Sequence, residues 1–435
     1  MVYNSIMNGM NWFSKWSSDQ IKQLLLDQFD SFNQTELGIK REKLRSIQQT
    51  LNSPHVVVIS GLRRVGKSTL LAQVAKEIGD DQYYYLNFED ERFIDFNAEN
   101  FNTLFQFLVE VFGCRKVFLI DEIQNLSGWE YFVRRFMDQG YKFIITGSNT
   151  SLLSGKLGER LTGRYIPIEL FPFSFREFLQ FISYEIPLLK KMTSIEEALL
   201  QKKFSEYLSQ GGVPDAIKYP ELPILKSLYN DVLYRDIAAR YHITSTTALQ
   251  ELAYFLISNP SSTISYNKLK SRLKLGSVTT VTSYIQHLQN SWLMFAVNVF
   301  DFSVKRQQLA PKKIYMIDTG LANEVGFHFL PNTGKLLENI VFLEFRRLTS
   351  EIYYYSSQDG YEADLYLPEM RQLVQISQDM HDSQTREREL RSLVNSCQEL
   401  HLSEGMILTE KEAGEMNVGG INIITKSIYK WLLER

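Results

Sequence analysis

Residues 61–68 read GLRRVGKS, and their types and spacing are suited to holding a chain of phosphates. Gly61 and Gly66 let the backbone curl so that its N–H groups face phosphate oxygens, Lys67 can reach the β- and γ-phosphates, and the Ser68 hydroxyl can bind Mg²⁺. A β-branched run precedes this loop and an amphipathic helical pattern follows it, so a glycine turn without a ligand is the weaker interpretation. The predicted nucleotide contacts are Gly61, Arg64, Val65, Gly66, Lys67, Ser68 and Thr69.

A pair of carboxylates is predicted to complete the phosphate site. The run KVFLIDEIQ, residues 116–124, has the pattern of a buried strand that ends at Asp121 and Glu122. Ligands of open α/β sheets bind at the carboxyl ends of the strands. We expect Asp121 to hold Mg²⁺ through water and Glu122 to act as the base that orients the attacking water. An Asp-Glu pair is often only a strand end that meets solvent, but its place 54 residues after Lys67 favours the catalytic interpretation.

Polar and basic side chains near two later strands are candidates for contacts with the γ-phosphate. Ser148 or Asn149, within TGSNTSLLS, is expected beside that phosphate, although a Ser-Asn pair is also common in ordinary turns. Arg160 and Arg164 flank the predicted strand 165–170, and either could neutralise charge in the transition state as arginine fingers do. Arg164 is the stronger candidate, in its own chain or on a neighbouring copy.

These residues need a sheet to bring them together, and the sequence predicts one. Short apolar runs alternate with helical patterns, which is typical of a parallel sheet. Gly79 and Gly140 provide stops for two of the helices. We therefore expect an α/β fold with strands at 56–60, 83–88, 117–121, 142–146 and 165–170, and with helices at 67–78, 99–112 and 128–139.

The middle of the chain predicts a second kind of module. Helical patterns before Pro260, at 265–274 and at 277–290, with a strand after the last, follow the element order of a winged helix-turn-helix. Ser277 has the side chain of an N-cap for the third helix. Residues 172–233 also read as helices and are the expected lid behind the sheet.

Charge is unevenly distributed along the chain. Residues 234–320 contain ten Lys or Arg and four Asp or Glu, a net charge of +6 in a chain whose net charge is −3. A basic island of this kind is what binding to a phosphate backbone needs. The third helix lacks the arginines that read guanine edges, and winged helices also serve as protein-contact modules or spacers, so the partner is a nucleic acid or an unknown protein. The candidate contacts lie in 268–274 and 305–313 and are Lys268, Lys270, Arg272, Lys274, Lys305, Arg306, Lys312 and Lys313.

The C-terminal part has the layout of a metal-dependent nuclease with two groups changed. Glu338 on a helix and Asp364 and Gln375 on a hairpin at 361–377 occupy the metal-binding positions of this layout, and Ser377 occupies the position of its lysine. Strand alternation predicts Glu362, Asp364, Gln375 and Ser377 on one face. In PD-(D/E)xK nucleases a lysine stands where Ser377 is found, and losing such a stabiliser typically costs about a hundredfold or more in rate. Lys335 or Arg386 could substitute from a helix, but we expect little or no cutting activity.

Several segments together resemble a family of prokaryotic AAA-type P-loop ATPases that carry an uncharacterised PD-(D/E)xK nuclease-like C-terminal domain. They are GLRRVGKSTLL, FLIDEIQN, TGSNTSLLSGKLGERLTGRYIPIELFPFSFREFL and GGVPDAI, with YRDI, IYMIDTGLAN, LLENIVFLEFRR and TRERELRSL later in the chain. The resemblance covers almost all of the chain from about residue 40 onward. It implies that Lys67, Ser68, Asp121 and Glu122 are nucleotide-site residues. It also implies kinship with signal-transducing ATPases that act as switches more than as motors.

Length and composition fit several domains in a reducing compartment. With 435 residues the chain is too long for one hydrophobic core. Two distant cysteines, Cys114 and Cys397, argue against a disulfide framework or a zinc site, and neither a secretion signal nor a membrane-spanning run is found, so a cytoplasmic protein is expected. The expected domains are an N-terminal helical segment (1–50), a P-loop ATPase core (51–171), a helical lid (172–233), a winged helix (234–310) and an inactive nuclease-like domain (311–435).

The sequence therefore favours a Mg²⁺-dependent ATPase whose nucleotide state, ATP or ADP, changes how the winged-helix and nuclease-like domains meet a partner. Two alternatives remain open. One is a nucleotide-gated binding or scaffold protein with negligible turnover, and the other is an active nuclease regulated by ATP. The physiological partner and the oligomeric state, including a homo-oligomer, are left open by the sequence.

Overall fold

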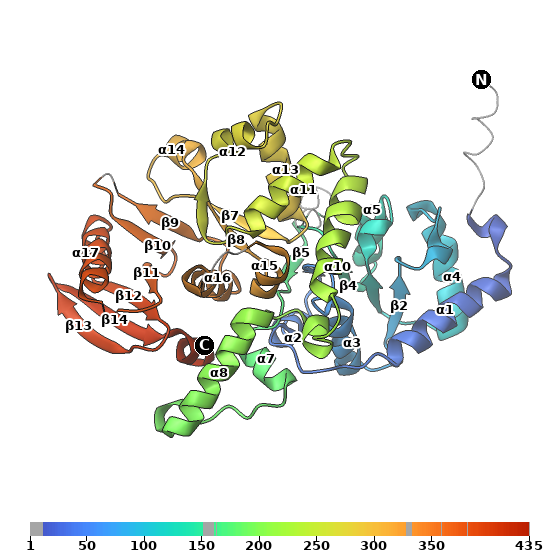
Figure 1. The fold of residues 1–435 in the computed structure, drawn as a ribbon. Coiled ribbons are helices and arrows are strands. Elements are labelled where there is room, and N and C mark those ends of the chain that lie inside the picture. Colours follow the sequence, from blue (N-terminus) through green and yellow to red (C-terminus); the bar gives the residue numbers. More distant parts are fainter. Residues whose placement is uncertain are drawn as a thin grey trace. The chain divides into compact units, whose positions relative to one another are not determined.

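The structure of the protein, a computed structural model, describes residues 12–150, 161, 163–327, 333–357, 359–380 and 382–434. The chain divides into two compact units, Met1–Leu170 and Phe171–Arg435. Within the described residues, the first unit holds a five-stranded sheet, and the second holds a three-stranded and a six-stranded sheet (Figure 1).

The described strands of the first unit form a parallel sheet in the order β2-β3-β4-β1-β5. This confirms the predicted α/β fold with a parallel sheet. β1 lies between β4 and β5 and is buried along its whole length, as expected for an interior parallel strand of β-branched residues. The strands are β1 (Val56–Ser60), β2 (Tyr83–Asn87), β3 (Val117–Asp121), β4 (Lys142–Gly147) and β5 (Tyr165–Glu169).

The helices of the first unit follow the predicted pattern closely. Gly79 and Gly113 follow the ends of two of them with φ angles of 99° and 75°, a conformation that favours glycine. Ser17 begins the first helix with a capping box, in which its side chain and that of Gln20 each bond the other's backbone N–H. The helices are α1 (Ser18–Asn33), α2 (Lys43–Gln48), α3 (Lys67–Ile78), α4 (Phe101–Phe112) and α5 (Trp129–Asp138), with short 3-10 turns η1 (Trp12–Lys15), η2 (Glu91–Phe93), η3 (Ala98–Asn100) and η4 (Ile123–Asn125).

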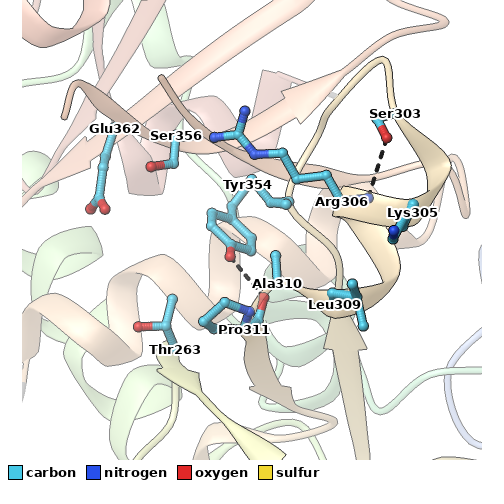
Figure 2. A pocket seen from close by; sticks show the side chains of 11 residues that line it. Thr263, Ser303, Lys305, Arg306, Leu309, Ala310, Pro311, Tyr354, Ser356 and Glu362 are labelled. Carbon is cyan, nitrogen blue, oxygen red and sulfur yellow. Dashed lines mark hydrogen bonds between the residues drawn. The ribbon is translucent and has the colours of Figure 1, made fainter. Parts of the chain in front are cut away.

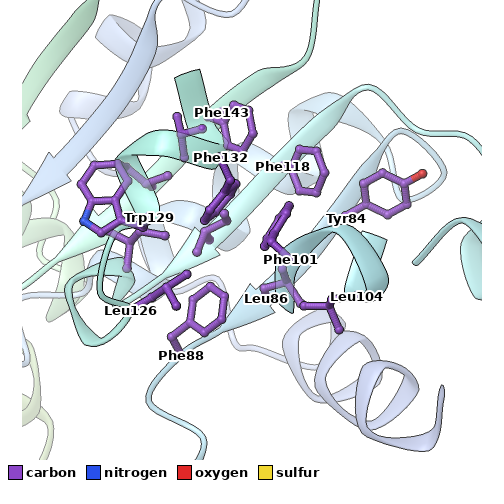
Figure 3. Packing of buried hydrophobic residues seen from close by; sticks show 14 of the residues in the cluster. Tyr84, Leu86, Phe88, Phe101, Leu104, Phe118, Leu126, Trp129, Phe132 and Phe143 are labelled. Carbon is purple, nitrogen blue, oxygen red and sulfur yellow. The ribbon is translucent and has the colours of Figure 1, made fainter. Parts of the chain in front are cut away.

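Aromatic packing holds α4 and α5 against this sheet (Figure 3). The ring of Phe101 on α4 stacks on Phe132 of α5 at 3.6 Å between centroids, and Phe118 of β3 stacks on Phe143 of β4 at 4.8 Å. Burying each such ring stabilises the fold by roughly 1.5–3 kcal/mol. The N-terminal segment joins the same core, since Trp12 is buried and stacks on Phe93. The strand ends that carry the predicted site are therefore fixed by a dense core.

The second unit begins with helices and a small antiparallel sheet in the order β6-β8-β7. Ser277 caps α13 as expected, because its side chain accepts from the N–H of Thr280 at 3.0 Å. β8 lies beyond residue 310 and is the central strand, so this sheet continues across the domain boundary expected there. The elements are α7 (Phe175–Phe181), η6 (Leu189–Lys191), α8 (Ser194–Gln210), α9 (Pro214–Lys218), α10 (Ile224–Asp231), the π-helix η7 (Val232–Ala239), α11 (Thr246–Ile257), β6 (Ser262–Ile264), α12 (Tyr266–Arg272), α13 (Val278–Asn290), β7 (Met294–Val297), α14 (Val304–Leu309) and β8 (Lys312–Met316).

The rest of the second unit is built on a mixed sheet in the order β13-β14-β12-β11-β10-β9. Leu393 and Cys397 of α17 pack on Leu373 of β11 and Ile407 of β12 in one buried cluster. The elements are α15 (Thr319–Val325), α16 (Thr333–Arg346), β9 (Tyr353–Ser356), β10 (Glu362–Leu367), β11 (Gln372–Ser377), α17 (Ser383–Glu399), β12 (Glu404–Thr409), β13 (Gly414–Val418), β14 (Ile421–Ser427) and α18 (Ile428–Glu434).

A buried carboxylate explains two sequence motifs, GGVPDAI and IYMIDTGLAN. The Asp318 carboxylate accepts the N–H groups of Gly212 at 2.6 Å and of Leu321 at 3.0 Å, and so caps α15 while holding the loop after α8. A Cβ atom on Gly211 would lie 2.1 Å from an oxygen of Asp318, so glycine is required there. Burial raises the pKa of Asp318 to about 6.

Replacing Asp318 by alanine should destabilise the second unit. The change leaves the N–H groups of Gly212 and Leu321 buried without these acceptors, and each such group costs about 1–3 kcal/mol. We expect a lower free energy of unfolding in chemical denaturation, with Glu221→Ala, an exposed acidic position in the same unit, close to the wild type. Equal stability of Asp318→Ala and Glu221→Ala would show that the two N–H groups find other acceptors.

Candidate nucleotide site

The order of the strands brings the predicted phosphate loop and the predicted carboxylates to one edge of the sheet. β4 lies between β1 and β3, so the carboxyl ends of all three strands are adjacent. Thr146 near the end of β4 connects them: its hydroxyl donates to the Asp121 carboxylate and accepts the N–H of Glu122 at 3.0 Å. Ser60 at the end of β1 donates to the carbonyl of Asn149 at 3.2 Å.

The loop after β1 holds a buried lysine at its centre. Lys67 is 5% exposed, and its ammonium donates to the carbonyl oxygens of Gly61 and Leu62 at 3.2 and 3.1 Å. Gly66 has a φ angle of 91°, and a Cβ atom on Gly61 would lie 2.2 Å from the Leu170 carbonyl oxygen. Both glycines are therefore required by the path of the loop.

The remaining predicted contacts lie in or beside this loop. Arg64 is exposed and has a positive φ angle of 62°, Val65 is buried, and Thr69 is half-buried in the first turn of α3. Arg41 supports the loop from outside, because its guanidinium donates to the Val65 carbonyl at 2.6 Å. The sequence did not predict that role for Arg41, which lies before the first strand.

The groups expected to hold Mg²⁺ lie together. The Ser68 hydroxyl hydrogen-bonds the carboxylate of Asp121, and burial raises the pKa of Asp121 while the bonds from Ser68 and Thr146 work to lower it. Among the described residues, no cluster of three or more His, Cys, Asp or Glu side chains could hold a metal ion. A hydroxyl and one carboxylate suit Mg²⁺, which usually keeps several waters and takes further oxygens from a substrate's phosphates.

Glu122 has the environment of an ionised base. Its backbone adopts a left-handed conformation with φ 49°, which turns the residue after β3 away from the strand direction. Burial works to raise the pKa of Glu122, but the Lys67 ammonium, 3.6 Å away, and the Gln124 amide together lower it below its usual value. The carboxylate is therefore charged at neutral pH, as a base that accepts a proton from water must be.

Gln124 is a site residue that the sequence did not predict. Its amide donates to the Glu122 carboxylate and, at 3.3 Å, to the Ser148 hydroxyl. Gln124 thus joins the predicted base to one of the two predicted γ-phosphate sensors. The sequence offered only a polar residue two positions after Glu122, and polar residues are too common in turns for this to identify a site residue.

Arg164 does not reach this site within its own chain. β5 runs parallel to β1, and Arg164 precedes the first residue of β5, so it lies at the amino edge of the sheet while the phosphate loop lies at the carboxyl edge. Its guanidinium pairs with Asp138 at 2.8 Å. The prediction of Arg164 as an arginine finger in its own chain is therefore wrong, because five residues of strand, about 17 Å, intervene. Arg160 lies outside the described residues.

Strand alternation predicted one face with Glu362, Asp364, Gln375 and Ser377, and the structure does not form this face as predicted. Asp364 and Leu365 together oppose Tyr354 of β9, so β10 has one extra residue, a β-bulge. The bulge turns the Asp364 carboxylate toward Lys313, at 2.8 Å, whereas Gln375 donates to Glu389 of α17 at 2.5 Å. Ser377 donates to the Asp379 carbonyl at 3.1 Å.

The segments predicted to contact nucleic acid differ in accessibility. Lys313 is buried, which removes it from the predicted surface. Lys305 and Arg306 of α14 line a cavity of about 670 Å³ (Figure 2). The hydroxyls of Thr263, Ser303 and Ser356 and one acidic residue, Glu362, line it as well. Phe302, just before α14, is 88% exposed.

Fold and site together define a P-loop protein of the AAA ATPase class. Residues 53–179 match the family described as "AAA domain", and residues 201–331 match a "Domain of unknown function (DUF8612)". The second match begins among the helices expected as a lid and ends after β8.

Two curated relatives match more than two thirds of the chain. It is 32% identical over 351 residues to the uncharacterised protein MJ1544 of Methanocaldococcus jannaschii, with 78% of each chain covered. It is 31% identical over 325 residues to an uncharacterised protein of Haemophilus influenzae, covering 71% of this chain and 79% of that one. The chain belongs to the family of these two proteins.

Solved structures add little to this assignment. The Orc1 protein of Aeropyrum pernix, solved in complex with DNA, is 12% identical, covers 66% of this chain and 92% of its own, and gives a TM-score of 0.31. AMPPCP-bound DnaA from Aquifex aeolicus is 17% identical, with 57% and 86% covered and a TM-score of 0.26. Scores this low carry no argument about function.

Of the helices in the described ranges, none is long and apolar enough to cross a membrane. Both cysteines are free, Cys114 exposed and Cys397 buried, and burial raises the pKa of the Cys397 thiol to about 12.

Gln124→Ala should slow ATP hydrolysis without weakening nucleotide binding. The amide positions Glu122 and has no bond to the phosphate loop among those described, so we expect kcat to fall by about tenfold, in line with the loss of a supporting hydrogen bond. Steady-state turnover and titration with a fluorescent nucleotide measure the two effects separately. Gln139→Ala, at an exposed position after α5, is the control. An unchanged kcat in Gln124→Ala would contradict this role.

Proposed function

We propose that this chain binds ATP with Mg²⁺ and hydrolyses it at the carboxyl edge of the first sheet. The observation that carries the proposal is the convergence of four side chains on that edge: Lys67 lies 3.6 Å from Glu122, and Ser68 bonds Asp121. Thr146 joins Asp121 to the backbone of Glu122. The loop glycines and the ammonium suit a polyphosphate, Ser68 and Asp121 suit Mg²⁺, and the Glu122 carboxylate suits a water molecule.

Each of these residues has a separate task in the proposed reaction. Lys67 exchanges its two carbonyl acceptors for phosphate oxygens, which draws its charge toward the β- and γ-phosphates. Bound Mg²⁺ supplies charge stabilisation at the phosphate oxygens. Glu122 orients a water and accepts its proton, and Gln124 links this carboxylate to Ser148. When Lys67 moves toward phosphate, its ammonium moves relative to the Glu122 carboxylate, which lies 3.6 Å away. ATP binding thereby affects how readily Glu122 accepts a proton.

The nucleotide state is proposed to act as a switch on the second unit, which carries the predicted winged helix and the nuclease-like sheet. Support for a switch comes from the family resemblance of the motifs and not from any contact between the units. If turnover is negligible, the same site serves a nucleotide-gated binding protein. An active nuclease regulated by ATP is the third candidate.

Nucleic acid is the partner that the second unit supports best. Lys305 and Arg306 stand beside hydroxyls in the cavity of Figure 2, and the exposed ring of Phe302 lies next to them along the chain. Cations with an exposed aromatic ring suit a phosphate backbone and a stacked base. α12 adds Lys270, with Lys274 following it. A protein partner remains the alternative, because Val304 and Leu309 of α14 are also exposed.

Two substitutions separate nucleotide binding from hydrolysis. Lys67→Ala should abolish tight ATP binding because the β- and γ-phosphates lose their cation, whereas Glu122→Gln should retain binding and lose hydrolysis, by about a hundredfold or more. Binding is measured by titration and turnover by phosphate release. Glu77→Gln, at an exposed position on the same helix as Lys67, is the control. Equal turnover of Glu122→Gln and wild type would remove Glu122 as the base.

Salt dependence tests the nucleic-acid partner. Binding to single-stranded DNA or RNA should weaken steeply as salt rises, with a logarithmic slope of about −0.7 per phosphate contact. Alanine at Lys270, Lys274, Lys305 and Arg306 should flatten that slope, while alanine at Lys190 and Lys191, an exposed basic pair in η6 of the same unit, should not. Absence of binding at low salt, with ATP present and folding intact, would favour the protein partner.

A further inference from the structure

The second unit buries a lysine between two carboxylates that come from different elements. The Lys313 ammonium on β8 lies 2.7 Å from Glu338 Oε1 on α16 and 2.8 Å from Asp364 Oδ1 on β10. The three side chains are only 11%, 12% and 17% exposed. The two carboxylates are the pair that the sequence assigned to a metal ion.

The position of the ammonium is set by the backbone from which it projects. β8 is the central strand of its sheet, and Lys313 is paired with Thr263 on one side and Val297 on the other. Tyr315, two residues further and so on the same face, donates its hydroxyl to Glu338 at 2.7 Å. Asn339 bonds both the N–H and the carbonyl of Met316, at 2.7 and 2.9 Å, and fixes α16 against β8.

The second carboxylate is positioned just as firmly. The bulge in β10 aims Asp364 at Lys313, and its other oxygen accepts the N–H of Ile376 on β11 at 2.9 Å. Gln375, the third predicted metal ligand, is engaged elsewhere: its amide nitrogen donates to Glu389 and its oxygen accepts the N–H of Asp364. Two carboxylate oxygens and one ammonium therefore meet at this point.

Two buried carboxylates at one point require a positive charge. Their oxygens lie 2.7 and 2.8 Å from one ammonium, and the two side chains are only 12% and 17% exposed, so little solvent screens the two carboxylates from each other. Removing one partner from such a buried group is strongly destabilising, whereas a pair with good geometry and with its remaining lone pairs bonded is retained. The donors Tyr315 and Ile376 complete the bonding that one lysine cannot provide.

We infer that Lys313 is the resident cation of this site, standing where a divalent ion would otherwise be needed and joining β8, α16 and β10 into one block. The lysine that the hairpin lacks at Ser377 is thus supplied by another strand, but as the occupant of the metal position. The C-terminal sheet then works as a binding or structural module without a divalent ion at Glu338 and Asp364. The inference does not depend on ATP hydrolysis by the first unit.

Metal binding to the nucleotide-free chain tests the inference. Mn²⁺ is titrated into wild type, Asp364→Asn, Lys313→Met and Lys313→Met/Asp364→Asn, and the free ion is followed by electron paramagnetic resonance. We expect wild type and Asp364→Asn to bind the same number of ions. Lys313→Met should gain one ion, which the double variant loses. Because all variants keep Asp121 and Ser68, the differences report on the site of Lys313, Glu338 and Asp364 and not on the nucleotide site.

Unfolding midpoints give a second readout. Lys313→Met should unfold at a lower temperature than Lys312→Met, its neighbour on the same strand, and Mn²⁺ should raise the midpoint of Lys313→Met but not of the double variant. If Lys313→Met does not fold, a folded Lys313→Arg with a midpoint near wild type supports the need for a cation at this point. An ion that wild type binds and Asp364→Asn loses would overturn the inference, as would a Lys313→Met that folds and gains no ion.

Discussion

The parallel pairing of β1, β4 and β3 is the constraint on which the nucleotide site depends. Parallel strands place all their carboxyl ends at one edge, so the loop after β1 and the acidic pair after β3 meet although 54 residues separate Lys67 from Asp121. The strand inserted between them contributes Thr146, whose hydroxyl joins Asp121 to the backbone of Glu122. The aromatic core beneath fixes these strand ends, and with them the distances in the site.

Each unit has a buried lysine close to carboxylates, Lys67 in the first and Lys313 in the second, and the two lysines differ in their partners. Lys67 is held by two neutral carbonyl oxygens and lies 3.6 Å from Glu122, so its bonds can be exchanged for phosphate without leaving a charge unpaired. Lys313 contacts two carboxylates within 2.8 Å and cannot leave without exposing two negative charges to each other. The first arrangement suits a ligand that comes and goes, and the second suits a permanent contact between elements.

Local backbone geometry decides where several charged side chains point. The left-handed conformation of Glu122 turns its carboxylate toward Lys67 and Gln124. The bulge in β10 turns Asp364 away from Glu389, the side chain to which Gln375 donates. Asp318 acts in the same way on the motifs around Gly212 and Leu321, which are far apart in sequence and share one carboxylate. Motifs that read as separate signals in the chain are thus parts of single hydrogen-bonded networks.

The five strands, the parallel sheet and the loop that carries Lys67 and Ser68 could all be predicted from the sequence, because hydrophobic periodicity, glycine spacing and β-branched runs are local properties. The sequence also placed Asp121 and Glu122 at a strand end. Three contacts became visible only in the folded chain: Arg164 lies at the opposite edge of the sheet, Gln124 joins Glu122 to Ser148, and Lys313 lies between Glu338 and Asp364. Strand direction, the left-handed turn at Glu122 and a one-residue bulge set these contacts, and none of the three leaves a periodic signal in the sequence.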